Sequence, residues 1–336
     1  MEALSVKPDM FMDIPTFIIS EMPVTTSKGN FGPRKVELSN YVKMPIFGLG
    51  TSHSGGYSQE AVVYALKDCN YRLIDTAKRY GCEEFLQSAI HLSGVPREDI
   101  FLTSKLWCTD YGKSTTRKAF QGSMKRLGVD YLDLFMMHWP LCPSNFMHKE
   151  KTLEETWREL EMLYDEGLCR AIGVSNYSIE DLEKLMDTAS VTPHVNQVEF
   201  HPFQNPIDLR EFCHENKIQM EGYCPLGKGK LLGEKAVIRV AKRCGRTPAQ
   251  VLIRWSIQNN VVTIPKSTQV KRVKENCEVF DFQLNDDEMD ILNSLHDGRR
   301  IVDVSSIQEK IDSRLPDGYK LKLVNYESEK INYRHY

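Results

Sequence analysis

Asp75, Lys105 and His138 occur in three successive apolar runs of the sequence, and Tyr80 follows five residues after Asp75. A charged side chain at the end of a buried strand is costly to desolvate unless it interacts with another such group. We therefore expect these four side chains to converge on one site.

Together, the four residues could protonate a carbonyl oxygen. A free phenol, with a pKa of about 10, is a poor acid at neutral pH. A nearby Lys105 ammonium would favour the phenolate and lower the pKa of Tyr80, and Asp75 would keep that ammonium charged and oriented. His138 would hydrogen-bond the same carbonyl oxygen. A carbonyl that is protonated also needs a hydride donor, so this set points to a nicotinamide cofactor.

Eight near-continuous apolar runs predict the parallel strands that must position these residues. The runs lie at 46–51, 72–77, 100–106, 132–139, 169–176, 194–200, 219–226 and 261–267. Helical patterns alternate with them at 59–69, 82–93, 114–127, 156–167, 181–189, 205–217, 234–244, 269–279 and 285–295, and a further helix begins at Pro248.

Residue types at the helix starts support these assignments. Ser58, Ser178 and Thr247 are residues of the N-cap type, each directly before a helical pattern. Thr152 is followed three residues later by Glu155, which predicts a capping box in front of the fourth helix.

Eight strands, each followed by a helix, predict the α/β class and a single-domain (β/α)8 barrel of the TIM type. The alternative is an open, doubly wound sheet, whose first turn carries G-x-G-x-x-G. The first turn here, at 48–55, lacks the third glycine at its place. We expect an irregular arm at 1–35, a barrel at 36–300 that opens with a β-hairpin at 36–46, and a polar tail at 301–336.

Composition narrows the class of protein. The 336 residues carry 43 Lys and Arg against 46 Asp and Glu, a net charge of −3, which argues against nucleic-acid binding. No apolar stretch is long enough for a membrane helix, and the N-terminus does not resemble a secretory signal, so we expect a cytoplasmic protein. The nine scattered cysteines predict reduced thiols, with no disulfide framework and no metal site.

The order of the motifs resembles the aldo-keto reductase family over about residues 36–300. The motifs are Gly48-Leu49-Gly50-Thr51, Asp75-Thr76-Ala77 with Tyr80, Ser104-Lys105-Leu106-Trp107, His138-Trp139-Pro140, Gly173-Val174-Ser175-Asn176, Asn196-Gln197-Val198-Glu199, Tyr223-Cys224-Pro225-Leu226-Gly227 and Ile264-Pro265-Lys266-Ser267. The resemblance implies NADPH-dependent reduction of aldehydes and ketones, with Tyr80 as general acid and with Asp75, Lys105 and His138 completing the catalytic set. We expect a monomer that acts on a small carbonyl compound.

The resemblance also implies where NADPH or NADP+ and the substrate bind. Ser175, Asn176 and Gln197 would bind the nicotinamide carboxamide, and Tyr223 would stack on its ring. The expected cofactor-binding residues are Gly50, Thr51, Asp75, Ser175, Asn176, Gln197, Tyr223, Leu226, Gly227, Lys228, Pro265, Lys266, Ser267, Arg272, Glu275 and Asn276. The expected substrate-binding residues are Tyr80, Trp107, His138 and Trp139. Lys266, Ser267 and Arg272, at a helix N-terminus, suit a 2′-phosphate and favour NADP over NAD.

Several departures from the family pattern bear on the substrate. Ser52 and His53 replace an aromatic residue that many members carry, and the loop from His138 to Thr152 is short. The tail after Arg300 does not resemble the pocket-lining C-terminus of mammalian-type members. We therefore expect the substrate range of the short-loop bacterial and plant forms: small aldehydes, ketoaldehydes or aromatic aldehydes.

Two other functions fit parts of the sequence. Lys105 could form a Schiff base in a barrel aldolase, although this chemistry explains neither Ser175 and Asn176 nor the basic segment around Lys266. A barrel of this family could also serve as a cofactor-binding subunit or a structural protein, with the arm and the tail binding a partner.

Overall fold

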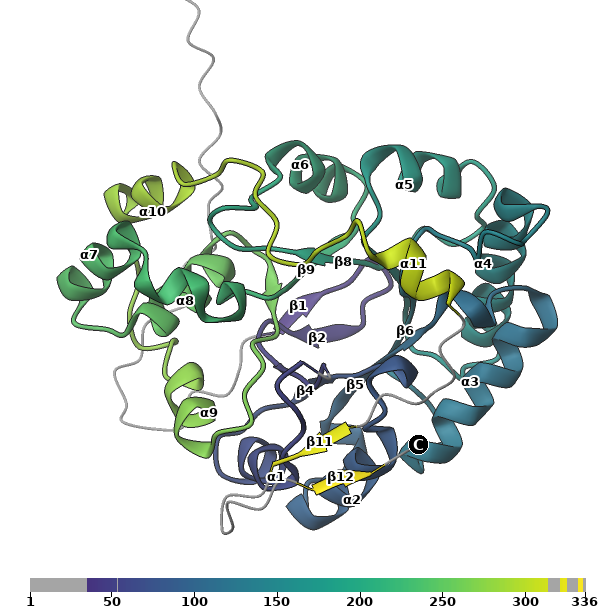
Figure 1. Ribbon diagram of the computed structural model, residues 1–336, viewed down its shortest axis with the longest axis horizontal. Helices are drawn as coiled ribbons and strands as arrows, with labels where there is room; N and C mark the ends of the chain where they lie inside the picture. Colours follow the sequence, from purple (N-terminus) through teal and green to yellow (C-terminus); the bar gives the residue numbers. More distant parts are fainter. Residues whose placement is uncertain (1–34, 53, 314–320, 325–331, 335–336) are drawn as a thin grey trace, which may run out of the picture. The chain divides into compact units, whose positions relative to one another are not determined.

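The computed structural model describes residues 35–52, 54–313, 321–324 and 332–334 (Figure 1). All but the last residue of the expected arm at 1–35, as well as His53, lie outside the described residues. Eight parallel strands form the central sheet: β3 (Leu49–Gly50), β4 (Leu73–Asp75), β5 (Phe101–Leu106), β6 (Leu134–Met137), β7 (Ile172–Ser175), β8 (Val195–Glu199), β9 (Gln219–Tyr223) and β10 (Val262–Thr263).

The sheet closes on itself. Its strands are hydrogen-bonded in chain order from β3 to β10. Backbone hydrogen bonds then join the two ends, from Gly48 N to Thr263 O at 3.0 Å and from Thr263 N to Ile46 O at 2.9 Å. The predicted (β/α)8 barrel is confirmed, and the open doubly wound sheet is excluded.

Helices surround the barrel (Figure 1). The α-helices are α1 (Gln59–Lys67), α2 (Glu83–Ser93), α3 (Lys113–Leu127), α4 (Lys149–Asp165), α5 (Ile179–Met186), α6 (Ile207–Glu215), α7 (Lys235–Cys244), α8 (Pro248–Gln258), α9 (Val270–Cys277), α10 (Asp286–Asn293) and α11 (Ile307–Asp312). Short 3-10 helices are η1 (Lys78–Tyr80), η2 (Arg97–Asp99), η3 (Cys108–Asp110) and η4 (Gly227–Gly233).

Most helix starts agree with their capping residues. Ser58 accepts a hydrogen bond from Ala61 N, and Ser178 and Thr247 both form complete capping boxes. The capping box expected at Thr152 is wrong, because α4 begins three residues earlier and contains Thr152. The Thr152 hydroxyl instead donates to His148 O at 2.8 Å, the bond that a threonine inside a helix commonly makes to the preceding turn.

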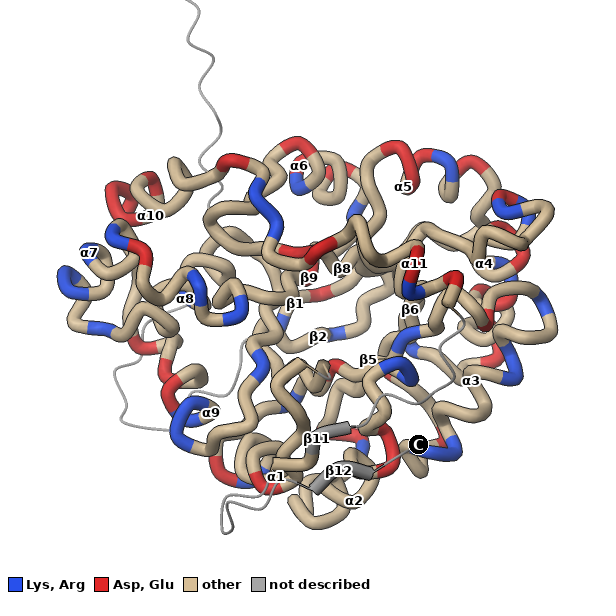
Figure 2. The backbone as a smooth tube through the Cα atoms, viewed as in Figure 1, with Lys and Arg blue, Asp and Glu red and all other residues tan. Residues whose placement is uncertain are grey.

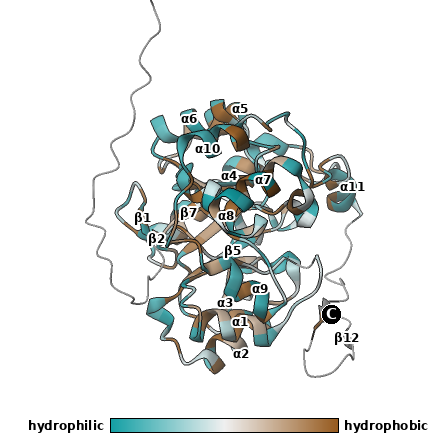
Figure 3. Ribbon diagram, turned by 90° about the vertical axis from the view of Figure 1, so that its left-hand side faces the viewer, coloured by the Kyte–Doolittle hydropathy of each residue, from teal (hydrophilic) through white to brown (hydrophobic). Residues whose placement is uncertain are grey.

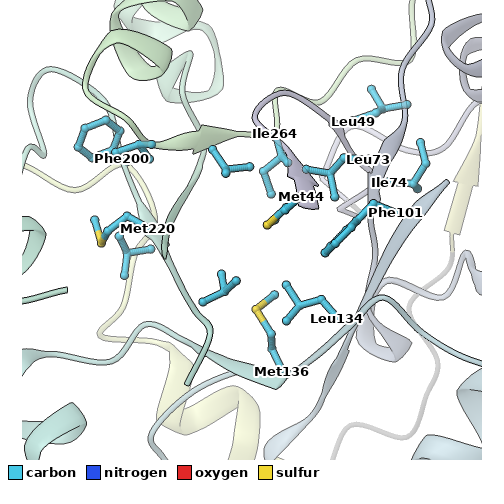
Figure 4. Packing of buried hydrophobic residues seen from close by; sticks show 14 of the residues in the cluster. Met44, Leu49, Leu73, Ile74, Phe101, Leu134, Met136, Phe200, Met220 and Ile264 are labelled. Atoms are coloured by element: carbon cyan, nitrogen blue, oxygen red, sulfur yellow. The ribbon is translucent and has the colours of Figure 1, made fainter. Parts of the chain in front are cut away.

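The predicted hairpin closes one end of the barrel. Strands β1 (Lys35–Glu37) and β2 (Lys43–Pro45) pair antiparallel. Met44 of β2 is fully buried and lies among Leu73, Phe101 and Ile264 inside the barrel (Figure 4). Figure 3 shows the hairpin on one side of the barrel and α11 on the other. The hairpin therefore fills the amino-terminal end of the barrel and leaves the carboxyl ends of the strands for the site.

The first part of the tail is attached to the barrel at two places. Glu199 of β8 accepts hydrogen bonds from Ile301 N at 2.6 Å and Val302 N at 3.2 Å. Asp312 of α11 accepts hydrogen bonds from both Ser144 N and Ser144 Oγ at 2.6 Å. Residues 301–313 are therefore fixed over the loop that follows β6.

Further along the tail, β11 (Leu321–Leu323) and β12 (Asn332–Arg334) pair antiparallel, and Leu323 forms a bridge with Tyr57. Among the described residues, no helix combines the length and the apolar character needed to cross a membrane.

Candidate active site

A cavity of about 640 Å³ opens where the carboxyl ends of the barrel strands meet. Residues that follow β3, β4, β6, β7, β9 and β10 line it, together with residues of α9 and of the tail. Catalytic sites of closed parallel barrels occur at this end.

Asp75, Lys105 and Tyr80 form a buried hydrogen-bonded group at one end of this cavity. Lys105 Nζ lies 2.5 Å from Asp75 Oδ2, 3.2 Å from Thr76 O and 3.5 Å from Tyr80 Oη. Lys105 is only 1% exposed, so its charge is held in place by these oxygen atoms and not by water. The rings of Tyr80 and His138 meet edge to face with centroids 5.8 Å apart. The convergence expected from the sequence is therefore present.

The pKa of Tyr80 is raised well above its ordinary value in this arrangement. Burial of the hydroxyl is the largest cause, and the negative charge of Asp75 is the next. Desolvation disfavours the phenolate, and in the free protein this outweighs the nearby ammonium of Lys105. The expectation of a lowered pKa is therefore wrong for the free protein, in which Tyr80 retains its proton.

Gln197 links Asp75 to a second buried acid. Its Nε2 donates to Asp75 Oδ2 at 2.9 Å and to Glu221 Oε2 at 2.8 Å. Burial raises the pKa of Glu221 to about 8, and the charge of Asp75 adds to this rise. Because both donor hydrogens of the Gln197 amide are engaged, its carbonyl oxygen is left to accept a hydrogen bond.

Uncharged polar groups line the wall beside the catalytic set. Asn176 Nδ2 donates to His138 O at 2.9 Å and to Ser175 Oγ at 3.0 Å, and Tyr223 Oη donates to Asn176 Oδ1 at 2.7 Å. Asn176 adopts a left-handed backbone conformation with φ 66°, a conformation that Asn tolerates better than most residues. These bonds fix the Asn176 amide and tie it to the backbone of His138.

Basic groups surround the far end of the cavity. Lys266 Nζ donates to Ser54 O at 2.6 Å, and burial lowers the pKa of Lys266 to about 8. Ser267 and Arg272 line the same end, and α9 begins between them at Val270. Figure 2 shows the Lys and Arg residues along α9. This end therefore combines cations with a helix N-terminus, the arrangement that suits a phosphate group.

The structure brings most of the expected site residues to the cavity. The expected residues that line it are Gly50, Asp75, Tyr80, Trp107, His138, Trp139, Ser175, Asn176, Gln197, Tyr223, Leu226, Lys228, Pro265, Lys266, Ser267, Arg272, Glu275 and Asn276. Lys105 and Thr51 do not line the cavity, but both form hydrogen bonds to Asp75, which does. Lys105 Nζ lies 2.5 Å from Asp75 Oδ2, and the Thr51 hydroxyl donates to Asp75 O at 2.8 Å. Gly227 is also outside the lining, in the η4 turn with φ 54°.

Other lining residues were not expected from the sequence. Arg79 precedes Tyr80 in η1, and Val302, Ile307 and Lys310 come from the tail. No residue of the tail was among the expected site residues. Arg79 was detectable as a charged residue directly beside Tyr80, whereas the polar sequence of the tail gave no signal.

The nine cysteines are free thiols, in agreement with the sequence analysis. Cys82 is fully buried beside Thr51 and Thr76, and burial raises its pKa to about 11. Cys224 lines the cavity, and burial raises its pKa to about 12. Neither residue is therefore a thiolate nucleophile at neutral pH. No group of three or more His, Cys, Asp or Glu within the described chain is arranged to hold a metal ion.

Comparison with known proteins agrees with this fold. Residues 46–297 match the model of the aldo/keto reductase family. An uncharacterised oxidoreductase of Caenorhabditis elegans is 51% identical over 285 residues, which cover 84% of this chain and 88% of that protein. The chain belongs to the aldo/keto reductase family, as the motif order predicts.

Two further relatives have more specific descriptions. A glyoxal reductase of Bacillus subtilis is 44% identical over 268 residues, covering 79% of this chain and 94% of that enzyme. A solved structure of a Bombyx mori aldo-keto reductase in complex with NADP is 29% identical and superposes with a TM-score of 0.76. The match covers 82% of this chain and 97% of that one.

Proposed function

We propose that this protein reduces small aldehydes, ketoaldehydes and aromatic aldehydes to alcohols with NADPH, using Tyr80 as the general acid. The hydrogen-bonded group of Asp75, Lys105 and Tyr80 at the end of the cavity is the observation that carries the proposal. The glyoxal reductase among the relatives supports a ketoaldehyde as one substrate.

The cavity has the chemistry that an NADP cofactor requires. Ser175, Asn176 and Gln197 offer acceptor oxygen atoms that suit a carboxamide, and the Tyr223 ring offers a stacking surface. At the other end, Lys266 and Arg272 suit a 2′-phosphate, as the NADP complex of the Bombyx mori relative would lead us to expect. The cofactor supplies the hydride when it is bound.

The side chains of this chain would supply the proton and position the carbonyl. His138 and Tyr80 hold the carbonyl oxygen, because both line the same end of the cavity and their rings are in contact. Tyr80 keeps its proton in the free protein and gives it up as negative charge develops on the carbonyl oxygen, since an alkoxide is much more basic than a phenolate. Lys105 then stabilises the phenolate, and Asp75 keeps the Lys105 ammonium in place.

The geometry disfavours the Schiff-base alternative. Lys105 is buried behind Asp75, is hydrogen-bonded to both Asp75 and Thr76, and does not line the cavity. An aldolase lysine must reach its substrate as a free amine.

A non-catalytic role would not explain the hydrogen-bonded group that Asp75, Lys105 and Tyr80 form at the end of the cavity. We also predict that the protein acts as a monomer in the cytoplasm.

Replacement of Tyr80 by Phe tests the proposal. We expect wild-type protein to oxidise NADPH in the presence of phenylglyoxal or 4-nitrobenzaldehyde, and Tyr80→Phe to lower kcat by about 10²- to 10⁴-fold while NADPH still binds. Tyr57→Phe is a matched control, because the Tyr57 hydroxyl is also buried but does not line the cavity. Full turnover by Tyr80→Phe would overturn the assigned role of Tyr80. NADPH binding without turnover of any carbonyl by the wild type would favour the non-catalytic role.

A further inference from the structure

Glu221 is a buried acid that does not line the cavity but contacts a residue that does. It lies on β9 in register with Gln197 of β8, the neighbouring strand of the barrel (Figure 1). Glu221 is fully buried, whereas Gln197 lines the cavity at the carboxyl ends of the strands. Glu221 can therefore act on a bound molecule only through Gln197 or through its charge.

Two carboxyl groups determine which way the Gln197 amide points. Gln197 Nε2 donates to Asp75 Oδ2 at 2.9 Å and to Glu221 Oε2 at 2.8 Å. In the reversed orientation the amide carbonyl would face two carboxyl oxygens, and both donor hydrogens would lose their partners. Asp75 alone would engage only one of the two hydrogens. Glu221 therefore completes the pair of acceptors that leaves the Gln197 carbonyl oxygen to the cavity.

Glu221 also belongs to the group of charges around Tyr80. The charged groups that act on it are Asp75 of β4 and Lys105 of β5, while its register neighbours on β8 and β10 are uncharged. Burial, with the charge of Asp75, raises the pKa of Glu221 to about 8, so its carboxyl holds a proton at neutral pH. Because Oε2 accepts from Gln197, the proton sits on Oε1.

Loss of this proton would make Tyr80 a weaker acid. The negative charge of Glu221 raises the pKa of Tyr80, in the same direction as the charge of Asp75 does. A phenol with a higher pKa gives up its proton less readily. Lys105, whose Nζ lies 3.5 Å from Tyr80 Oη, would then be shared between two carboxylates. The same negative charge would favour a positively charged ring in the cavity over a neutral one.

We propose that Glu221 is a positioning residue for the reaction: its protonated carboxyl fixes the Gln197 amide for the nicotinamide carboxamide, and its ionisation in alkaline solution slows proton transfer from Tyr80. This inference rests on the proposed carbonyl reduction. It assigns the alkaline limit of that reaction to an acid outside the cavity lining.

The affinities for NADP+ and NADPH test the role of the charge without a reaction. Lys266 titrates in the same pH range, but it would act equally on both cofactors and cancels in the ratio of their affinities. In wild-type protein we expect the affinity for NADP+ to rise relative to that for NADPH by about three- to tenfold between about pH 7 and about pH 9.5, since the oxidised ring is positively charged. Glu221→Gln keeps an acceptor for Gln197 and has no proton to lose, so its ratio should stay constant.

Glu221→Leu separates the positioning of Gln197 from the effect of charge. Leucine cannot accept from Gln197, so we expect the affinities for both cofactors to fall by about three- to tenfold at neutral pH, while Glu221→Gln stays within about twofold of wild type. Glu161→Gln is a matched control. The buried Glu161 accepts hydrogen bonds from Ser190 N and Val191 N outside the cavity lining, so its replacement should leave both affinities and their ratio unchanged.

Single-turnover rates with saturating NADPH test the effect on proton transfer. Saturation removes the contribution of cofactor binding. With phenylglyoxal, the rate for wild-type protein should fall by about three- to tenfold between about pH 7 and about pH 9.5. Glu161→Gln should keep this fall, and Glu221→Gln should lose it. A fall of the same size in Glu221→Gln, or a constant affinity ratio in wild-type protein, would overturn the inference.

The failure of this inference can be distinguished from the failure of the proposed function. Carbonyl reduction with the same alkaline fall in wild-type and Glu221→Gln protein keeps the function and refutes the role of Glu221. Affinity ratios that change as expected, without turnover of any carbonyl compound, refute carbonyl reduction and keep the action of Glu221 on the cofactor. Wild-type protein that binds neither cofactor contradicts both.

Discussion

Replacing Glu221 by Gln should make the protein more stable at alkaline pH. Glu221 is fully buried on β9, and its Oε2 accepts a hydrogen bond from Gln197. Its second oxygen, Oε1, has no hydrogen-bond partner among the described residues. Asp75 lies on the other side of the same amide and is already paired with Lys105. Two acids therefore share one cation, and the neutral form of Glu221 is favoured.

The size of the effect follows from the pKa. The pKa of Glu221 rises from 4.5 to about 8 in the folded protein because burial disfavours its charged form. A folded protein that holds a proton which the unfolded chain has lost becomes less stable as pH rises, by about 1.4 kcal/mol per pH unit. The stability contributed by neutral Glu221 is thus fully present below about pH 4.5 and is lost by about pH 8, roughly 5 kcal/mol in all. A glutamine at this position has no proton to lose.

Urea unfolding at several pH values measures this difference. The free energy of unfolding of Glu221→Gln, minus that of wild-type protein, should rise steadily between about pH 5 and pH 8 and then level off. Titrating groups that do not interact with Glu221 contribute equally in both proteins, so they cancel in the difference. A difference that is the same at about pH 5.5 and pH 8.5 would refute the reasoning. Glu159→Gln is a suitable control, because the buried Glu159 has its own cation in Arg117 and should lose stability on replacement.

Two further predictions concern the cofactor and the tail. The pKa of Lys266 lies at about 8, so the affinity for NADPH, measured by fluorescence titration, should fall above that pH as Lys266 loses its proton, by as much as about tenfold at pH 9. Lys266→Met should bind NADPH weakly with no such fall, and the same fall in that variant would contradict the role of Lys266. Asp312→Ala removes the two hydrogen bonds from Ser144 and should raise KM for the carbonyl by about two- to fivefold with kcat unchanged. Asp303→Ala, which removes hydrogen bonds within its own turn, should leave KM unchanged, and an equal rise in both variants would contradict the role given to α11.

The barrel could be predicted because the sequence patterns that mark its strands and helices are local. Each strand lies in a near-continuous apolar run of the sequence. Ser178 and Thr247 satisfy N-terminal amides of the helices that they precede. The Thr152 signal failed because a threonine hydroxyl is equally well satisfied inside a helix by the carbonyl of His148. Residue type and spacing alone do not separate these two cases.

The part of the site that lies at the carboxyl ends of the strands could be predicted from the sequence. Tyr80, Lys105 and His138 converge because neighbouring parallel strands end at one edge of the barrel. Glu221 was missed because it lies inside an apolar run, and its importance appears only when β8 and β9 place it beside Gln197. The raised pKa of Tyr80 was missed as well, since desolvation depends on everything that packs around the hydroxyl.

The residues proposed for proton transfer and the tail residues that line the cavity lie in different parts of the chain. The residues proposed for proton transfer belong to the barrel, whereas Val302, Ile307 and Lys310 belong to a segment held on the barrel at Glu199 and Ser144. That segment contains none of the barrel strands β3 to β10. We therefore expect replacements in residues 301–313 to change which carbonyl compounds the protein accepts more than they change the proposed proton transfer, and a tail exchanged with that of a relative should carry part of the relative's substrate range with it.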